Sequence, residues 1–526
     1  MPTLGVCSKH NDYLLSASHR EGVGTLVSGF TACPGLFYAT SAKDGILSRL
    51  RIPGGILNSK QCQAIAEIAD IYGGGYVDVT NRANLQIREI SQDINSEVLK
   101  QLQDLGLGSR NSAVDHIRNI MISPTAGIDT AELIDTRPLV KSWDDYIAVH
   151  PELSGLSAKF SVCFDGGEKV SVSDRLNDIL LASEIIDTQV YFRLHLGLTK
   201  GKPPIDTGIL LSPEQCLSVL ATLAHVYLNH IDINSKRKLR LREVVNSLGW
   251  ENYLQQVEQC LTFSLTRCEK FIQKPSLLEK QACFWHIGIH RQRQQNLFYI
   301  GVVLPLGRLE SKQMRRLGDL AEKYGSKTIR LTPWQNLLIT DIPHKLIFDV
   351  QSEIADLGLD STVTNIKSAL VACSGKRGCA ASATDTKGHG LALANYLETR
   401  VKLDCPINIH FSGCEKSCAQ HQNSDITLLG VSDGLHPALG DRNTETYHIY
   451  VGDSNSYEKF GRQIYQYVSF AQLPALIEQM LKVYKIYRLN PDESFGKFVN
   501  RYKHTQLKEL FSQPSEIYLR SSAVCN

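Results

Sequence analysis

The sequence predicts an α+β fold that is internally duplicated, with two halves related by a pseudo-twofold axis. Three observations lead to this prediction. One segment repeats at a fixed distance along the chain, both copies show the same order of strands and helix, and four cysteines form two pairs in the second half. The repeat establishes the architecture, and the cysteines indicate where the chemistry lies.

The repeat appears when the chain is shifted by 252 residues against itself. Without a gap, this shift places DLGL at 104–107 on DLGL at 356–359, RIPGGILNSKQ (51–61) on VLPLGRLESKQ (303–313), and VDVTNRANLQIREI (77–90) on IRLTPWQNLLITDI (329–342). A period of this length excludes a solenoid. The chain is therefore a fused duplication.

Each copy has the periodicity of an α+β unit. Asn58 or Ser59 can cap a helix, a triple glycine can end it, and the alternation in VDV and LQIRE suits strands with one buried face. In the first copy these signals predict a helix over 58–71, a glycine stop at Gly73–Gly75, and strands at Leu47–Ile52, Tyr76–Val79 and Leu85–Ile90.

The two copies differ at polar positions of the second strand and the loop before it. The first copy has Arg82, Gln86 and Arg88, and the second has Trp334, Leu338 and Thr340. Because one copy of a duplication can keep the chemistry while the other keeps only its shape, we expect the functional loop in the first, more polar copy.

Composition excludes several classes of protein. Hydrophobic residues make up 43% and charged residues 21% of 526 residues, with a net charge of +2, so a nucleic-acid partner is not expected. No apolar run reaches the length of a membrane span, and the first residues lack the pattern of a signal peptide. A cytoplasmic enzyme with no membrane partner is the expectation.

Four of the 14 cysteines form the pattern C-x5-C-x34-C-x3-C. They are Cys373 and Cys379 in ACSGKRGCAAS, and Cys414 and Cys418 in HFSGCEKSCAQH. Four thiolates in two pairs suit an iron–sulfur cluster, whereas a zinc site favours tighter spacing. Neighbouring glycines and serines allow the backbone to approach the cluster sulfurs.

This cysteine pattern, following two related half-domains, resembles the nitrite/sulfite reductase haemoprotein family. The tail ESFGKFVNR (493–501) is also similar to that family. The resemblance implies a 4Fe–4S cluster on the four cysteines, two ferredoxin-like half-domains, and two larger α/β cofactor-binding domains. The expected limits are 30–95 and 290–350 for the half-domains, 105–275 and 355–490 for the larger domains, and 491–526 for a C-terminal tail.

The resemblance also implies an anion cradle of cationic side chains. By motif, its catalytic members map to Arg82 in TNRANLQIR, Arg118 in RNIMISPTAG and Lys159 in LSAKFSVCFDGGE. Reductases carry a second lysine or an asparagine two residues after the lysine, where this chain has Ser161. Further cofactor-binding positions are expected at Asn84, Gln86, Arg88, Lys376 and Arg377.

Other local motifs resemble a sister branch, the precorrin-3B synthases. They are TACPGLFYATSAKDGILSRLRIPGG (31–55), TPWQNLL (332–338) and GCEKSCAQH (413–421). This resemblance implies a monooxygenase that hydroxylates precorrin-3A with O2 and forms a lactone, with a tetrapyrrole as substrate, electrons from the cluster and an additional non-haem iron. His410 and His421 flank the cluster motif, and a structural role is the more ordinary one for such histidines.

Two other functions remain open. One is a sirohaem-dependent nitrite or sulfite reductase, and the other is an iron–sulfur electron carrier without catalysis. No dinucleotide fingerprint is present, so electrons are expected from a separate ferredoxin or flavin reductase. The basic run KRKLRLR (236–242) is interpreted as a solvated helix face, with docking of an acidic electron donor as the alternative.

Overall fold

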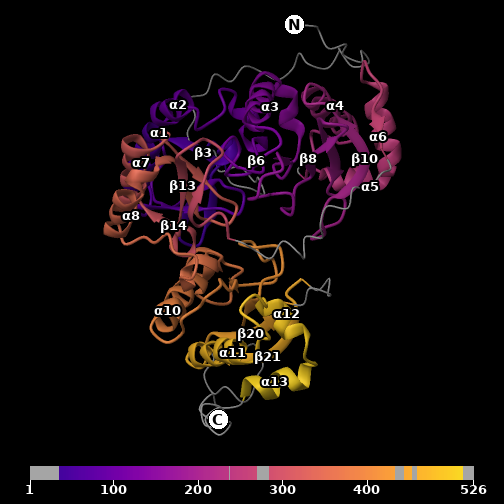
Figure 1. Cartoon of the computed structure of the whole chain (residues 1–526). Coiled ribbons are helices and arrows are strands. Elements are labelled where there is room, and N and C mark those ends of the chain that lie inside the picture. Colours follow the sequence, from indigo (N-terminus) through magenta and orange to yellow (C-terminus); the bar gives the residue numbers. More distant parts are fainter. Residues whose placement is uncertain (1–34, 236, 269–283, 433–443, 453–458, 513–526) are drawn as a thin grey trace.

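The computed structural model describes residues 35–235, 237–268, 284–432, 444–452 and 459–512. Within these ranges the strands form four sheets of five or six strands each. Two half-domains pair with each other, and each is accompanied by a larger domain; the second larger domain lies at the bottom of Figure 1. No helix in the described ranges is both long enough and apolar enough to cross a membrane. The predicted duplicated α+β fold is confirmed.

The two half-domains have the same order of elements. The first contains β1 (Thr40–Ala42), β2 (Gly45–Leu50), α1 (Ser59–Ile71), β4 (Tyr76–Val79), β5 (Leu85–Ile90) and α2 (Ser96–Asp104). The second contains β12 (Gly288–Arg291), β13 (Leu297–Val302), α7 (Ser311–Tyr324), β15 (Thr328–Leu331), β16 (Leu337–Pro343) and α8 (Ile347–Asp356).

The half-domains exchange a strand with each other. β14 (Arg308–Glu310) of the second copy pairs with β4 and completes the first sheet, in the order β1-β2-β5-β4-β14. β3 (Ile56–Asn58) of the first copy pairs with β15 and completes the second, in the order β12-β13-β16-β15-β3. The sequence gives no sign of β3, because three residues carry no periodicity and their partner is in the other copy.

The larger domains are also copies of one another. In the first, β6 (Ile120–Ile122), β7 (Val162–Asp165) and β8 (Ile179–Ile186) are parallel, and β9 (Gln189–Leu196), β10 (Ile205–Leu211) and β11 (Thr266–Arg267) continue antiparallel. In the second, β17 (Leu370–Ala372), β18 (Ile409–Ser412) and β19 (Ile426–Val431) are parallel, and β20 (Thr446–Val451) and β21 (Arg462–Ser469) continue antiparallel.

Helices follow at matching places in these two domains. The first has α3 (Arg137–Val149), α4 (Cys216–Asn229), α5 (Leu241–Leu248) and α6 (Trp250–Gln259). The second has α9 (Gly375–Gly378), α10 (Thr386–Glu398), α11 (Leu473–Tyr487), α12 (Phe495–Asn500) and α13 (His504–Ser512). Each larger domain buries its own apolar cluster, and a third cluster is shared by the two half-domains.

The pseudo-twofold axis passes between α1 and α7. The side chain of Gln63 donates to the carbonyl of Arg315, 252 residues further along the chain, and Gln63 also binds Asp319. Gly318 lies so close to Cys62 that an added Cβ would stand 2.9 Å from the Cys62 Cβ. Equivalent residues meet here, which is the geometry of an axis relating the two copies.

The local helix signals are confirmed in detail. Asn58 caps α1 through a bond from the backbone of Gln61, and the Gln61 side chain accepts from the Asn58 backbone, forming a capping box. β4 and β5 have the predicted limits. The strand predicted at Leu47–Ile52 is β2, which lies two residues earlier in the chain.

A repeated asparagine secures each half-domain from within. Asn84 Oδ1 accepts from the backbone N–H of Ile52 at 2.8 Å, and Asn336 Oδ1 accepts from Leu304 at the same distance. Both asparagines are buried. The asparagine shared by the copies therefore has a structural role in both.

Replacing either asparagine with alanine should therefore destabilise the protein similarly. Each variant leaves one buried backbone N–H without its acceptor, at a cost of about 1–3 kcal/mol. We expect the first thermal midpoint of Asn84→Ala and of Asn336→Ala to fall by several degrees, and that of exposed Asn490→Ala to stay. An unchanged midpoint in either variant would contradict this structural role.

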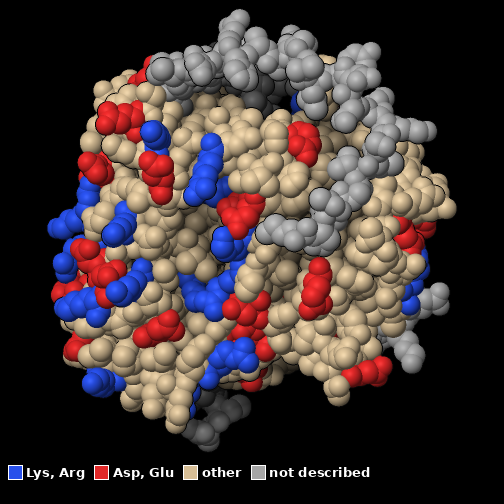
Figure 2. All heavy atoms as spheres, turned by 90° about the horizontal axis from the view of Figure 1, so that it is seen from above, with Lys and Arg blue, Asp and Glu red and all other residues tan. Residues whose placement is uncertain are grey.

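Charges are mixed on the face seen from above in Figure 2. Lys and Arg lie among Asp and Glu there, without a large area of one sign. This distribution agrees with the small net charge of the whole chain. On this face nothing resembles the basic stripe of a nucleic-acid-binding protein.

Candidate iron–sulfur and anion site

The cysteines lie where two neighbouring parallel strands end. Cys373 follows β17 directly, and Cys414 follows β18 after Gly413. Cys379 ends the single turn of α9, and Ser417 adopts a positive φ of 54° immediately before Cys418. The carboxyl ends of parallel strands are the usual place for a ligand in such sheets.

The four cysteine thiols are close enough to influence one another electrostatically. Burial raises the pKa of the Cys418 thiol, and the neighbouring charges of Cys414, Cys373 and Cys379 raise it further. Cys418 is also exposed, so water screens part of this effect. The backbone N–H of Gly413 donates to Cys373 Sγ at 3.3 Å. In the described ranges no three acidic, His or Cys side chains are close enough to hold a single metal ion.

The first half-domain holds both cysteine loops. Asn81 donates to the carbonyl of Cys418 at 3.2 Å, and Arg88 donates to the carbonyl of Gly378 at 2.9 Å. Arg88 is buried and also pairs with Asp44 at 2.9 Å. Arg88, predicted as a cofactor ligand, thus contacts the backbone next to a cluster cysteine.

Cations gather beside the second cysteine loop. Arg82 donates to Asn177 Oδ1 and to the carbonyl of Leu176, both at 2.8 Å. Burial, followed by the charges of Arg82, Lys459, Arg240 and Lys200, lowers the pKa of His421 to about 4. His421 follows Cys418 by three residues, so these cations lie near the predicted cluster.

Arg118 has a different environment from the predicted one. It is 5% exposed and binds Asp144 through two bonds of 2.7 and 2.9 Å, and Asp115 at 3.3 Å. Its guanidinium forms part of the wall of a pocket of about 450 Å³ that Gly54 and Val140 also line. This pocket contains none of the cysteines, and Arg118 has two carboxylate partners, so the membership of Arg118 in the cradle stays a prediction.

The other predicted residues divide into two groups. Gln86 lies on β5 opposite Asp78 and Arg49, on the sheet that holds the cysteine loops, and Lys159 is exposed beside Arg240, which approaches its carbonyl. The remaining three have partners within the protein: Asn84 with Ile52, Lys376 with Glu445, and Arg377 with Asp385.

The residues present fit the predicted groups. Four thiols at two strand ends can ligate a four-iron cluster. The cations beside them suit a ring with many carboxylates and a small anion. His410 is buried with an Nε2 atom that has no partner in the described ranges, and burial lowers its pKa to about 3. A neutral His410 adds no charge to this cradle at neutral pH.

The first larger domain contains a second version of the cysteine loops. The segment SPTAGIDTAELIDT (123–136) corresponds to CSGKRGCAASATDT (373–386), and DGGEKVS (165–171) corresponds to SGCEKSC (412–418). The backbone bond from Ala383 to Gly413 recurs from Leu133 to Gly166, both at 2.8 Å. The four cysteines are thereby replaced by Ser123, Asp129, Gly167 and Ser171.

Carboxylates take the place of a cluster in this copy. Asp165 accepts from the backbone of Gly167, Val172 and Ser173 and from the Ser171 hydroxyl. Asp129 accepts from the Thr125 hydroxyl and from backbone groups in the same way. The backbone donors of these loops are satisfied within the protein, so this copy needs no inorganic cluster.

Trp334 fills the position that corresponds to Arg82. Its ring stacks on His286 at 4.4 Å and lies under the Arg175 guanidinium at 4.7 Å. Trp334 also packs against the apolar cluster of Met121, Cys163, Val172, Leu180 and Ala182. An aromatic side chain thus closes the place in the first larger domain that corresponds to the cysteine loops of the second.

His286 should make the protein sensitive to acid. Burial, then the charges of Arg175 and His290, lowers the pKa of His286 to about 3. Below pH 6.5 the unfolded chain binds a proton that the folded protein does not, so stability falls as the pH falls from 6.5 towards 3, by about 2 kcal/mol at pH 5. His286→Phe keeps the stacking, and we expect its thermal midpoint to fall less than the wild-type midpoint between pH 7 and pH 5. Exposed His344→Gln should follow the wild type.

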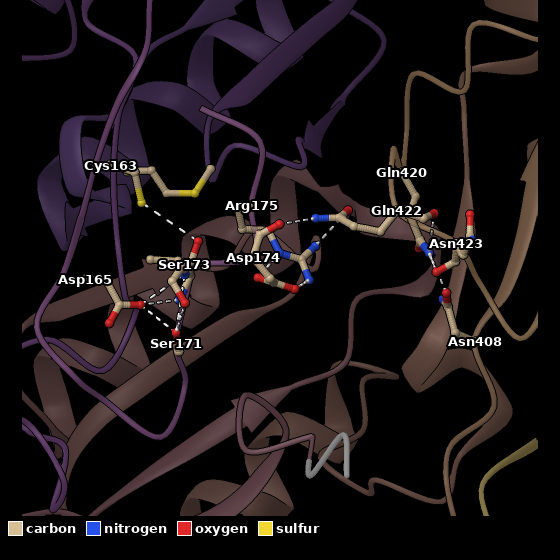
Figure 3. A network of polar contacts seen from close by, with 12 residues as sticks. Cys163, Asp165, Ser171, Ser173, Asp174, Arg175, Asn408, Gln420, Gln422 and Asn423 are labelled. Atoms are coloured by element: carbon tan, nitrogen blue, oxygen red, sulfur yellow. Dashed lines mark hydrogen bonds and ion pairs between the residues drawn. The ribbon is translucent and has the colours of Figure 1, made fainter. Parts of the chain in front are cut away.

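The closed copy contacts the cysteine loop across the pseudo-twofold axis. Arg175 donates to Gln422 Oε1 at 3.4 Å, and Gln422 donates to the carbonyl of Asp174 at 3.0 Å (Figure 3). Arg175 and Gln422 occupy corresponding positions in the two loops. On the far side, Gln420 continues the network to Asn408 at 2.6 Å. The copy without cysteines therefore supports the copy that has them.

Sequence reasoning missed several residues of this site. The contacts of Asn81, Asn177 and Asp178 were not predicted, and Arg240 was interpreted as part of a solvated helix face. A signal for the second copy of the cysteine loops was present: GGEKVS against GCEKSC, and IDT against TDT. These pairs align at shifts of 247 and 250, so a search restricted to a shift of 252 passes over them.

Sequence relatives of this chain are ferredoxin-dependent nitrite reductases. The ferredoxin–nitrite reductase of Synechococcus elongatus is 29% identical over 458 residues, which are 85% of this chain and 88% of the relative. That of Leptolyngbya laminosa is 30% identical over 435 residues, which are 80% of this chain and 82% of the relative. An assimilatory ferredoxin-dependent nitrite reductase of Haloferax mediterranei is 27% identical over 481 residues, which are 85% of this chain and 81% of the relative.

The prediction of a precorrin-3B synthase is wrong. The relatives that match over most of the chain are named as nitrite reductases, and they support the alternative that the sequence left open. The error came from weighing short motifs, one of which begins at residues 31–34, outside the described ranges. The tetrapyrrole substrate, the lactone and the additional iron were parts of that prediction, and no comparison supports them.

A solved structure supports the same fold. The NirA protein of Mycobacterium tuberculosis superposes with a TM-score of 0.73 and 23% sequence identity, covering 88% of this chain and 84% of that one. Two family models also match. The nitrite/sulfite reductase ferredoxin-like half domain covers residues 40–105 and 290–357, and the nitrite and sulphite reductase 4Fe-4S domain covers 113–265. With more than half of its length matched, the chain belongs to the nitrite/sulfite reductase family.

Proposed function

We propose that this protein is an oxidoreductase that reduces nitrite with electrons from ferredoxin, using a 4Fe–4S cluster and sirohaem. The observation that carries the proposal is the meeting of four cysteine thiols with the cations around Arg82 at one end of the second larger domain. The names of the relatives support nitrite as the substrate and ferredoxin as the electron donor.

In this proposal the four cysteines ligate the cluster. Cys373 receives a backbone hydrogen bond from Gly413, which stabilises a thiolate and adjusts the reduction potential. Arg88 and Asn81 fix the two cysteine loops against the first half-domain. When bound, sirohaem supplies the iron at which nitrite is reduced, and the cluster supplies electrons one at a time.

The cations provide binding and charge. Arg82 donates to Leu176 and Asn177, and these two bonds of 2.8 Å fix the orientation of its planar guanidinium group. Such an oriented guanidinium suits an oxyanion or a carboxylate of the ring. Cationic side chains attract the nitrite anion and offset the negative charge of the electrons added to it. The six-electron reduction of nitrite to ammonium also consumes protons.

The proposal excludes a simple electron carrier on physical grounds. A carrier needs the cluster and a docking surface, but it has no use for a group of four cations around the second cysteine loop. Within the described ranges only one such site is expected, because Trp334 and two buried carboxylates close the corresponding place in the first copy.

The test is a spectrum of protein purified without oxygen, followed by an assay. We expect the bands of an iron tetrapyrrole, about four irons in addition to the tetrapyrrole iron, and ammonium formed from nitrite with reduced ferredoxin. Turnover of sulfite but not nitrite would reject the substrate assignment and retain the cofactors. Iron–sulfur absorption without extractable tetrapyrrole would overturn the proposal.

A further inference from the structure

A lysine of α10 lies against both half-domains. Lys387 Nζ donates to the carbonyl of Leu306 at 2.8 Å, in the turn before β14, and to Asp78 Oδ1 on β4 at 3.3 Å. Figure 1 shows α10 next to β14, where the half-domains meet the second larger domain. The Lys387 side chain is only 15% exposed. An ammonium group is thus held where three parts of the chain meet.

The partners of Lys387 form a group with more positive than negative charge. Asp78 is buried and also accepts from Arg308 at 2.9 Å. Burial raises the pKa of the Asp78 carboxyl, but the charges of Lys387 and Arg308 outweigh this effect and lower that pKa overall. Asp78 is therefore an anion shared by two cations. The charge of Glu89 also acts on Arg308, but Glu89 is exposed and water screens it.

This charged group lies beside the first cluster cysteine. Thr386, the residue before Lys387, donates its hydroxyl to the carbonyl of Cys373 at 2.7 Å and lies 3.5 Å from Cys373 Sγ. Burial lowers the pKa of Lys387, and the charges of Asp78 and of the Cys373 thiolate oppose this lowering. Because the interaction between two charges is mutual, the charge of Lys387 acts equally on the sulfur of Cys373.

The larger domain without cysteines has a different arrangement at the corresponding place. Arg137 corresponds to Lys387 at the shift of 250 that aligns the two sets of loops. Its side chain is 42% exposed and pairs with Asp135 at 2.7 Å. Arg330 corresponds to Asp78 and is a buried cation. Removing an ion pair from water is costly, and of these two places only the one beside the cysteines has a lysine–aspartate pair inside the protein.

We propose that Lys387 raises the reduction potential of the 4Fe–4S cluster, an inference that rests on the cluster of the proposed function and not on nitrite as the substrate. Reduction transfers one electron from the electron donor, forms and breaks no bond, and makes the cluster with its thiolates more negative by one charge. A cation fixed inside the protein favours this reduced state, because net charge is one of the factors that set the potential. Lys387 acts through its charge, without ligating iron.

Four variants test this role in the full-length protein, purified without oxygen. Lys387→Met removes the charge and keeps most of the volume, whereas Lys387→Arg keeps the charge. Asp78→Asn removes the opposite charge from the same ion pair. Arg137→Met is the matched control from the first larger domain. The midpoint potential of the cluster is measured at pH 7 by redox titration with electron paramagnetic resonance, together with iron, acid-labile sulfide and the thermal midpoint.

Lys387→Met should lower the equilibrium constant for one-electron reduction of the cluster about tenfold, which corresponds to a potential about 59 mV more negative. Asp78→Asn should move the potential in the opposite direction, because it removes a negative charge from the same pair. Lys387→Arg and Arg137→Met should stay near the wild-type potential. A loss of packing alone would not give shifts of opposite sign at the two ends of one ion pair.

Equal potentials in Lys387→Met and Arg137→Met, or shifts of the same sign in Lys387→Met and Asp78→Asn, would overturn this role of Lys387. If Lys387→Met does not retain its cluster, the other two variants decide: a higher potential in Asp78→Asn with an unchanged one in Lys387→Arg supports the role, and any other result overturns it. Wild-type protein without a cluster would overturn the proposed function and this role together. A cluster without nitrite reduction would overturn the proposed function alone.

Discussion

Serine in place of Cys414 is expected to leave the protein without its iron–sulfur cluster. Cys414 follows β18 and belongs to the set whose charges act on Cys418. A serine hydroxyl is a poor substitute for a thiolate at a soft iron site. We expect acid-labile sulfide, and the iron in excess of the tetrapyrrole iron, to fall from about four per chain to well below one, together with the absorption of the cluster. Because the cluster binds only the folded state, the thermal midpoint should also fall.

The matched control is Cys405→Ser. Cys405 lies nine residues before Cys414 and approaches the Tyr484 hydroxyl at 3.5 Å, in the apolar part of the same domain. We expect this variant to keep its full iron content. Four irons retained in Cys414→Ser, or lost in Cys405→Ser, would contradict the assignment of the cluster ligands.

Glutamine in place of Arg82 should lower kcat/KM for nitrite by about 100-fold, because a charge-assisted hydrogen bond to an oxyanion is lost. Arg82 is positioned by two bonds of 2.8 Å, so its orientation as well as its charge contributes. Arg82→Lys should retain part of the activity, since it keeps the charge but not the planar pair of donors.

The measurement is steady-state nitrite reduction, normalised to the tetrapyrrole content of each preparation. This separates a loss of turnover from a loss of cofactor. Arg291→Gln, an exposed arginine on β12 of the other half-domain, is the control and should match the wild type. Full activity in Arg82→Gln at normal loading would remove Arg82 from the reaction.

The sequence predicted the parts of the fold that depend on neighbouring residues. The N-terminal cap of α1 at Asn58 and the limits of β4 and β5 follow from signals within a few residues, and the structure has them as predicted. β3 and β14 escaped prediction because each has a partner in the other copy and is only three residues long. No local pattern contains that information.

For the site too, the sequence indicates some residues and not the contacts of others. The cysteines were found because their spacing is a chemical signature in itself. The ion pairs of Arg118 with Asp115 and Asp144 could not be recognised from sequence, and its place in the cradle stays a prediction. Arg240 was overlooked because a run of basic residues gives no sign of which member turns inward. Short motifs also gave the wrong branch of the family, which only the similarity over most of the chain corrected.

The exchange of β3 and β14 has a consequence for synthesis of the protein on the ribosome. Asp78 on β4 binds Arg308 on β14 across 230 residues of chain. At ordinary rates of translation, the first sheet waits on the order of tens of seconds for its last strand. During that time the edge of β4 is open to pairing with another nascent chain. We therefore expect neither half to be stable when expressed alone, whereas two halves expressed together should assemble by exchanging these strands.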